Sequence, residues 1–248
     1  MAVQKKVQKS TTKKKKRKNR KKRYDLSRVW MALGTLTVIL LVIFGVAQHQ
    51  KTQNAAQQMS GLSAIDGSRP DLDVELLTVN PYSRPGTALT QVNGIVIHYT
   101  ANPGATAIAN RNYFENLKDT HTTKASAHFI VGLEGEIVQC IPTAEIAYAS
   151  NDRNSDTLSI ECCYEKDDGS FNRETYESVI RLTAWLCNKF GLTSEQVIRH
   201  YDVTGKLCPL YLSHVEHEDA WQQFKADVDT AIQAGENNTG TQNTGENG

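Results

Sequence analysis

The stretch SAHFIVGLEGEIVQCI, residues 126–141, decides which kind of sheet this chain can build. Two apolar runs stand on either side of Glu134 and Gly135, a pattern typical of a β-hairpin that turns at the glycine. The two strands of a hairpin are antiparallel, so a sheet that includes this one is not wholly parallel.

The segments on both sides of the hairpin alternate between strand-like and helix-like patterns. Short apolar, β-branched runs predict two more strands, GIVIHYT at 94–100 and TLSIECCY at 157–164. Apolar residues at helical spacing predict helices at 106–118, at 172–190, where Gly191 ends the helix, and at 217–232. Strands interleaved with helices are typical of the α/β class. We therefore predict an α/β fold with a central mixed β-sheet flanked by helices on both faces.

Charge is distributed unevenly along the 248 residues, although the formal net charge is only +1. Residues 1–28 hold fourteen of the 28 Lys and Arg against Asp25 alone, which leaves fourteen basic and 26 acidic residues for the remainder. A block this basic does not bury enough apolar surface to fold alone. It fits a nucleic-acid arm, a nuclear-type address or the cytoplasmic flank of a membrane span.

The next segment favours the membrane interpretation. VWMALGTLTVILLVIFGVA, residues 29–47, contains nineteen residues and no charge. As a helix it would be about 28 Å long, close to the roughly 30 Å hydrocarbon core of a bilayer. Lys and Arg lie on its N-terminal side only, which places that side in the cytoplasm. The alternative, a cleaved signal peptide, has a shorter apolar core with a small-residue cleavage site close behind it.

We therefore expect a single-pass protein of the cell membrane with an extracellular domain and no nucleic-acid partner. The polar residues after the apolar run read as a tether, and the final GENNTGTQNTGENG is low-complexity sequence without core-forming residues. The predicted parts are a basic cytoplasmic tail (1–28), a transmembrane signal-anchor helix (29–48), an extracytoplasmic linker (49–78), a catalytic domain (79–234) and a disordered tail (235–248).

The stretch RHYDVTGKLCP, residues 199–209, contains a histidine and a cysteine eight positions apart, His200 and Cys208. On its own it fits half of a disulfide, a reactive thiol or two arms of a metal site. His98 is a third candidate donor, because it lies at the carboxyl end of a predicted strand, where α/β sheets place ligand sites. Two imidazoles and a thiolate form a donor set suited to zinc, with the fourth coordination position left open for water. Calcium and magnesium prefer oxygen ligands instead. The alternatives are a satisfied core histidine for His98 and a surface side chain for His200.

Four separated motifs, IVIHYT, SAHFIVGLEGEIVQCIP, LSIECC and RHYDVTGKLCP, resemble a known family in their order and spacing. The family is that of the zinc-dependent N-acetylmuramoyl-L-alanine amidases, or amidase-2, which is related to T7 lysozyme and the peptidoglycan recognition proteins. The resemblance covers roughly residues 80–232, the whole predicted domain. It implies that His98, His200 and Cys208 hold Zn²⁺, that peptidoglycan is the substrate, and that the amide bond between N-acetylmuramic acid and L-alanine is cleaved. Relatives that only recognise peptidoglycan tend to lack the cysteine, so the resemblance implies a hydrolase.

Hydrolysis of an amide also requires a group that moves protons, and Glu161 is the best candidate. Alternation along its strand puts Ser159, Glu161 and Cys163 on one face and Ile160 and Cys162 on the other. A carboxylate among apolar neighbours is costly to bury unless it is paired or functional. A surface or ion-paired glutamate is the alternative.

The resemblance assigns two more positions. It implies that Lys206 steadies the developing oxyanion, as a point charge would. The position of the catalytic tyrosine of T7 lysozyme holds Ala127 here, which leaves proton transfer to Glu161.

The remaining histidines and cysteines are expected to be structural. His128 is expected in the groove or core, and His121, His214 and His217 on the surface. Cys140, Cys162, Cys163 and Cys187 are expected to be buried free thiols, although Cys162 and Cys187 could meet if the helix at 172–190 covers their face of the sheet.

Two other classes of function stay open. One is a peptidoglycan-binding sensor without hydrolytic activity, and the other is a structural membrane protein whose basic arm binds a partner inside the cell.

Overall fold

The computed structural model describes residues 30–31, 33, 35–37, 39–50, 65 and 67–242. Two compact units divide the chain, residues 1–55 and 56–248. In the first unit, every described residue from 30 to 50 is helical. Within the described ranges, no helix combines the length and the apolar composition that a membrane crossing requires. The predicted basic tail (1–28) and part of the predicted anchor (29–48) lie outside the described residues, and both stay predictions.

The second unit is built on a six-stranded sheet with the order β1-β4-β3-β5-β2-β6. Its strands are β1 (Asp73–Val74), β2 (Gly94–Tyr99), β3 (Phe129–Val131), β4 (Ile137–Gln139), β5 (Thr157–Cys162) and β6 (Val197–Arg199). The β3–β4 pair is antiparallel, whereas all the other neighbours are parallel. Gly135 adopts a φ of 83° in the β3–β4 turn, a conformation that glycine reaches without a steric penalty. The predicted hairpin and the mixed sheet are therefore confirmed.

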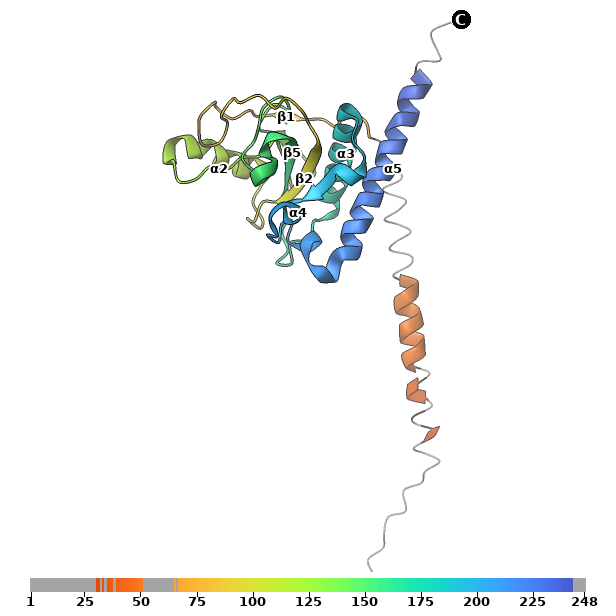
Figure 1. The fold of residues 1–248 in the computed structure, drawn as a ribbon. Coiled ribbons are helices and arrows are strands. Elements are labelled where there is room, and N and C mark those ends of the chain that lie inside the picture. Colours follow the sequence, from red (N-terminus) through yellow and green to blue (C-terminus); the bar gives the residue numbers. More distant parts are fainter. Residues whose placement is uncertain are drawn as a thin grey trace, which may run out of the picture. The chain divides into compact units, whose positions relative to one another are not determined.

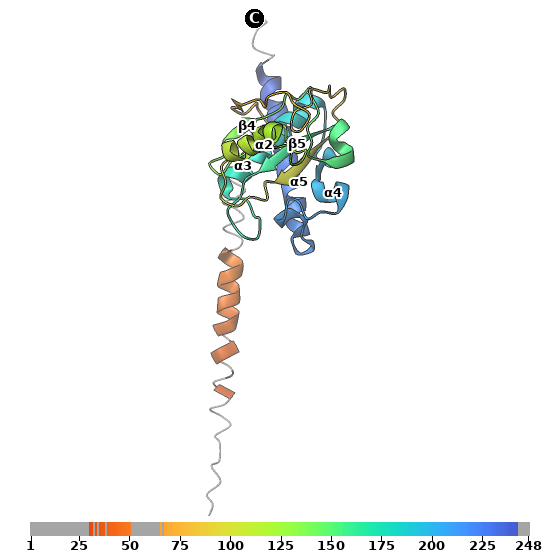
Figure 2. The ribbon, with the colours of Figure 1, turned by 90° about the vertical axis from the view of Figure 1, so that its left-hand side faces the viewer.

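Helices cover both faces of this sheet, as predicted (Figures 1 and 2). On one face lies α2 (Ala107–Thr120), and on the other lie α3 (Arg173–Phe190) and α5 (Glu218–Gln242), which pack against each other. The short elements are α4 (His200–Thr204) and the 3₁₀ turns η1 (Asn151–Ser155), η2 (Ser194–Gln196), η3 (Tyr211–Ser213) and η4 (Val215–His217). Helix α3 begins at the N-cap Asn172, whose side chain accepts from the Thr175 N–H, and ends at Gly191 in the left-handed region, where the sequence predicts its end.

Two apolar cores follow from the alternation of side chains along the strands. Leu158, Ile160 and Cys162 of β5 point into the core beneath α3 and α5. Cys163 belongs to the core beneath α2 instead. All five cysteines are buried and free, which agrees with the expectation for Cys140, Cys162, Cys163 and Cys187. One face of β5 is thus wholly apolar, and the other is the face on which Glu161 lies.

The folded unit starts upstream of the predicted boundary at residue 79. Leu77 is fully buried, β1 adds a strand to the sheet edge, and both lie in the range predicted as linker (49–78). At the other end, α5 continues to Gln242, beyond the predicted boundary at residue 234. The extension beyond residue 234, GENNTGTQ, contains no large apolar residue. Before residue 79, Leu72, Val74 and Leu76 alternate with acidic residues, a strand-like pattern that the prediction of a linker overlooks.

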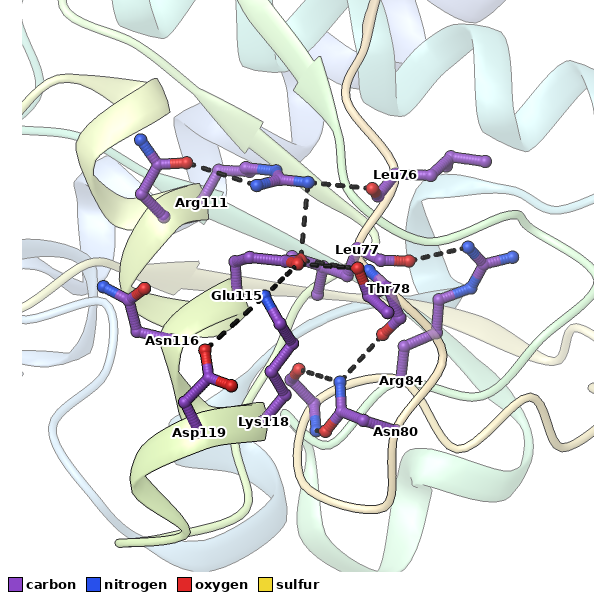
Figure 3. Close-up of polar contacts among 12 residues, drawn as sticks. Leu76, Leu77, Thr78, Asn80, Arg84, Arg111, Glu115, Asn116, Lys118 and Asp119 are labelled. Carbon is purple, nitrogen blue, oxygen red and sulfur yellow. Dashed lines mark hydrogen bonds and ion pairs between the residues drawn. The ribbon is translucent and has the colours of Figure 1, made fainter.

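A polar network fastens this upstream segment to α2 (Figure 3). The Glu115 carboxylate accepts from the Thr78 backbone N–H at 3.0 Å, from the Thr78 hydroxyl at 2.7 Å and from the Lys118 ammonium at 2.7 Å. Arg111 donates to the carbonyl oxygens of Glu75 and Leu76 at 2.9 and 2.8 Å. Partial burial would raise the pKa of Glu115, but these hydrogen bonds outweigh it and lower the pKa to about 2. The carboxylate is therefore ionised throughout the physiological range and holds the segment through charge-assisted bonds.

Candidate metal centre and active-site cleft

The candidate site lies at the carboxyl ends of three neighbouring parallel strands, β5, β2 and β6. His98 is the fifth of the six residues of β2, and it is in register with Glu161 of β5. On the other side, Ile97 pairs with Arg199 at the end of β6, so that His200 follows directly and opens α4. Parallel strands lie about 4.8 Å apart, so adjacent positions at one sheet edge bring these side chains together.

The three predicted metal donors converge. His98, His200 and Cys208 each offer one ligand atom, and these atoms all lie within 4.8 Å of one another. Cys208 Sγ is 3.7 Å from His98 Nδ1, and the centroids of the two imidazole rings are 4.7 Å apart. The side chains are well shielded, with exposed fractions of 2%, 8% and 2% for His98, His200 and Cys208. Residues about a hundred positions apart in the sequence thus form one cluster.

This donor set fits zinc. With zinc–nitrogen bonds of about 2.0–2.1 Å and a zinc–sulfur bond of about 2.3 Å, tetrahedral angles put a nitrogen and a sulfur ligand about 3.6 Å apart. The observed 3.7 Å between Cys208 Sγ and His98 Nδ1 agrees with that separation. Three protein ligands leave one tetrahedral position open, which is the arrangement of catalytic rather than structural zinc sites.

The protonation of the cluster also suits a metal. Burial lowers the pKa of His98 well below its usual value, and the charges of His200 and Lys206 lower it further. Burial and Lys206 lower the pKa of His200 in the same way. Both rings are therefore neutral at pH 7, the form in which imidazole binds a metal. Burial and the charge of Glu161 raise the pKa of Cys208 to about 12, although the Tyr99 N–H and Lys206 act to lower it. The thiol therefore loses its proton only when a cation compensates the negative charge.

Glu161 lies beside this cluster, on the polar face of β5 as predicted. Its Oε1 is 4.0 Å from His98 Nδ1, and its side chain is 15% exposed. Its Oε2 is buried and has no hydrogen-bond partner among the described residues. Burial raises the pKa of Glu161 to about 8, and the positive charge of Lys206 opposes the rise. A carboxyl group with a pKa near neutrality and an unpaired oxygen is suited to accept and return a proton.

The cluster opens into a cleft of about 410 Å³. Lys206 and Lys124 line it together with Glu161, so the basic side chains in its wall outnumber the acidic one. Lys206 is exposed and follows the left-handed Gly205 that ends α4. The other lining residues include Tyr99, Thr100, Ala101, Phe114, Ala125, Ser126, Tyr148, Ala149, Asn151 and Asn154. The wall of the cleft therefore mixes apolar groups, such as Phe114 and Ala125, with polar and charged groups in about equal measure.

The other predicted positions lie away from the cluster. His128 is a core residue: its Nδ1 accepts from the Ser159 N–H at 3.0 Å, and its Nε2 is 2.9 Å from the Glu145 carbonyl oxygen. Ala127 is fully buried in the core beneath α2. His121 and His214 are exposed, and His217 is partly exposed and stacks on Tyr211.

Two residues that the sequence does not predict contact the Nε2 nitrogens of the histidines. Ser150 Oγ is 3.2 Å from His98 Nε2, and Asn151 Oδ1 is 2.8 Å from His200 Nε2. Both belong to YASNDRNSD, a polar stretch without periodicity that precedes β5. Its richness in Asn, Asp and Ser indicates a turn, and nothing in it indicates contact with the candidate ligands.

Comparisons with known proteins agree with this geometry. Residues 88–210 match the family model described as N-acetylmuramoyl-L-alanine amidase, Amidase_2. The N-acetylmuramoyl-L-alanine amidase CwlL of Bacillus licheniformis is 42% identical over 144 residues, which cover 53% of this chain and 39% of the relative. The N-acetylmuramoyl-L-alanine amidase BlyA of Bacillus subtilis (strain 168) is 42% identical over 154 residues, which cover 54% and 40%. This chain thus spans about two fifths of the length of these curated relatives.

Solved structures share the fold. The catalytic domain of XlyA superimposes with a TM-score of 0.54 at 28% identity, covering 64% of this chain and 99% of that domain. The structure of PlyL gives a TM-score of 0.55 at 23% identity, covering 65% and 99%, and this likeness concerns the fold alone. The matched range 88–210 includes His98, Glu161, His200, Lys206 and Cys208. Residues 88–210 of this chain thus form an Amidase_2 domain, the domain of the N-acetylmuramoyl-L-alanine amidase family.

Proposed function

We propose that this chain is a membrane-anchored, zinc-dependent N-acetylmuramoyl-L-alanine amidase. It hydrolyses the amide bond between N-acetylmuramic acid and the L-alanine of the stem peptide in peptidoglycan. The observation that carries the proposal is the convergence of His98, His200 and Cys208 at one end of a cleft that also contains Glu161. The Amidase_2 domain and the names of the curated relatives support the same substrate.

His98, His200 and Cys208 would hold the metal. Zinc bound by two imidazoles and a thiolate supplies a Lewis acid that polarises a carbonyl group and makes water nucleophilic near pH 7. The neutral rings are prepared for this role, and the buried thiol loses its proton on binding. The donor set excludes hard, oxygen-seeking cations as the preferred occupant.

Glu161 moves the proton of the reaction. Its buried, unpaired Oε2 takes a proton from the attacking water and returns it to the nitrogen of the leaving L-alanine. The bond from the water oxygen to the carbonyl carbon forms first, and the carbonyl oxygen takes up the displaced electron pair as negative charge. The bond between the carbon and the nitrogen then breaks as the nitrogen receives the proton. One carboxyl group thus serves first as base and then as acid, which a pKa near neutrality permits.

Two further groups in the cleft act on the substrate. The ammonium of Lys206 stabilises the negative charge that develops on the carbonyl oxygen. The hydroxyl of Thr100 is buried, lines the cleft and has no hydrogen-bond partner among the described residues, so it is available to orient a polar substrate group.

The chain is anchored through residues 29–48, with the N-terminus in the cytoplasm and the amidase domain outside the cell membrane. The uncharged apolar run behind a basic tail supports this topology. Carbonate-washed membranes should retain the full chain, and protease added to intact protoplasts should remove the amidase domain. Recovery of the full chain in the soluble fraction would exclude the anchor without affecting the proposed activity.

Digestion of purified cell walls by the detergent-solubilised full chain tests the activity. Free amino groups of L-alanine should appear, a chelator should abolish their release, and added zinc should restore it. The variant Cys208→Ala should be inactive, whereas Cys140→Ala removes another buried thiol outside the donor set and should stay active. Binding to walls without release of L-alanine amino groups would favour the non-hydrolytic sensor instead.

A further inference from the structure

A short turn before β5 contacts one ring nitrogen, Nε2, of each candidate histidine ligand. Ser150 Oγ lies 3.2 Å from His98 Nε2, and Asn151 Oδ1 lies 2.8 Å from His200 Nε2. Two consecutive residues of one turn thus contact two rings that come from different elements, β2 and α4. The amidase chemistry proposed above assigns no role to either residue.

The backbone of this turn is held in place by Asn154. Its Oδ1 accepts from the Ala149 N–H at 3.0 Å and from the Ser150 N–H at 2.6 Å. Ser150 is fully buried, and it precedes the 3₁₀ turn Asn151–Ser155. Asn151 adopts a φ of 51°, in the left-handed region that asparagine tolerates better than most residues. The turn therefore presents both side chains from a backbone with little freedom.

These contacts select which ring nitrogen is available to a metal. A side-chain amide oxygen only accepts hydrogen bonds, so its partner His200 Nε2 carries the proton. The lone pair of His200 then resides on Nδ1. On His98, Ser150 occupies Nε2, and Nδ1 is the nitrogen that lies 3.7 Å from Cys208 Sγ. Both rings thus have Nε2 engaged by the turn and Nδ1 available for coordination.

We propose that Ser150 and Asn151 are positioning residues of the metal centre, which fix the Nδ1 nitrogens of His98 and His200 as the ligating atoms. The inference rests on the zinc site proposed above. Hydrogen-bond partners of ligating histidines orient the rings and raise their basicity, and their loss typically weakens metal binding by about 10–100-fold. Asn151 has the greater effect, because its bond to His200 is the shorter and its acceptor is unambiguous.

Zinc affinity of the full chain, measured by competition with a chromophoric chelator, tests this role. Asn151→Gly removes the acceptor and keeps a residue that tolerates positive φ, and it should weaken zinc binding by about 10–100-fold. Asn151→Asp retains an oxygen acceptor and should bind within about threefold of the wild type. Asp152→Gly adds a glycine to the same turn at an exposed position and should leave the affinity unchanged.

Ser150→Ala should weaken zinc binding in the same direction as Asn151→Gly. The absorption bands of the cobalt-substituted protein report the ligand field directly, and they should shift for Asn151→Gly but not for Asp152→Gly. Thermal unfolding of the metal-free variants is the control for the fold. A variant that loses zinc affinity because its fold is damaged should also show a lower unfolding midpoint than the wild type.

The possible results separate the two proposals. If the wild type binds zinc no more tightly than Cys208→Ala, the zinc site itself is wrong, and this inference falls with it. If the wild type binds zinc and Asn151→Gly binds it equally well with an unchanged cobalt spectrum, the positioning role alone is refuted. Equal losses for Asn151→Gly and Asp152→Gly would also refute it, since flexibility of the turn would then explain both.

Discussion

Replacing Glu115 with glutamine should destabilise the amidase domain, but only at pH values at which the Glu115 carboxylate of the wild type is ionised. The substitution keeps an oxygen that can accept from Thr78 but removes the charge that attracts Lys118 and Arg111. In the unfolded chain the group has its ordinary pKa of 4.5, and in the folded domain the pKa is about 2. Glu115→Gln thus isolates the contribution of charge to the network that fastens the segment before β2 to α2 (Figure 3).

The magnitude follows from the two pKa values. At about 1.4 kcal/mol per pKa unit, the interval between 4.5 and about 2 corresponds to at most about 3–4 kcal/mol. The network lies near the surface, where solvent screens charges, so the expected loss is about 1–2 kcal/mol at pH 7. For a domain of this size the midpoint of thermal unfolding should fall by about 3–6 °C.

The pH dependence has a definite sign. A group whose pKa is lower in the folded state than in the unfolded state stabilises the folded state fully at pH values above its unfolded-state pKa. This stabilisation is lost as the pH falls towards the folded-state pKa. The difference between Glu115→Gln and the wild type should therefore be full at pH 7 and shrink between about pH 4.5 and pH 2. Urea unfolding at pH 7 and pH 3 measures it, with Glu134→Gln in the exposed hairpin turn as a control. A difference of the same size at both pH values, or none at pH 7, would refute the assigned role of the charge.

Three further predictions concern the cleft. Cys208→Ala should lose bound zinc and wall hydrolysis together, as measured by metal analysis and release of L-alanine amino groups, and an active, metal-free variant would contradict the donor set. Glu161→Gln should retain zinc while kcat falls by about 10²–10⁴-fold, and full activity would remove the proton-transfer role. Lys206→Met should lower kcat by up to about 10²-fold with zinc content unchanged, and Lys206→Arg should recover part of the loss. A change in KM alone for Lys206→Met would mean that this lysine binds substrate rather than stabilising charge.

The central elements of the fold could be predicted because their residues carry strong local patterns. The hairpin around Gly135 and the helix that ends at Gly191 both combine apolar periodicity with a residue suited to positive φ. The strands β1 and β6 have two and three residues at the two edges of the sheet, lack the turn glycine that marks the hairpin, and form because the sheet edge supplies hydrogen-bond partners. Pairing of that kind depends on the tertiary structure and leaves no mark in a short window of sequence.

The candidate site could be predicted in part for a similar reason. His98 and Glu161 sit on strands whose direction and alternation give their positions, and His200 and Cys208 occur within one motif. Ser150 and Asn151 lie in a turn whose sequence indicates only that it is a turn, and their contacts with the rings arise from three-dimensional placement. The anchor at 29–48 rests on composition alone and stays a prediction.

The register of the central ladder has a consequence for mutational studies of this domain. His98 stands opposite Glu161, and one step beyond the pair Ile97–Arg199 comes His200. A shift of one strand by a single residue would move its side chains to the opposite face and withdraw a donor from the cluster. Substitutions in the buried middle of β2 can therefore lower metal occupancy of the proposed zinc site in a protein that is still folded. Metal content, measured beside stability, would reveal such variants, which a screen for unfolding alone would pass as normal.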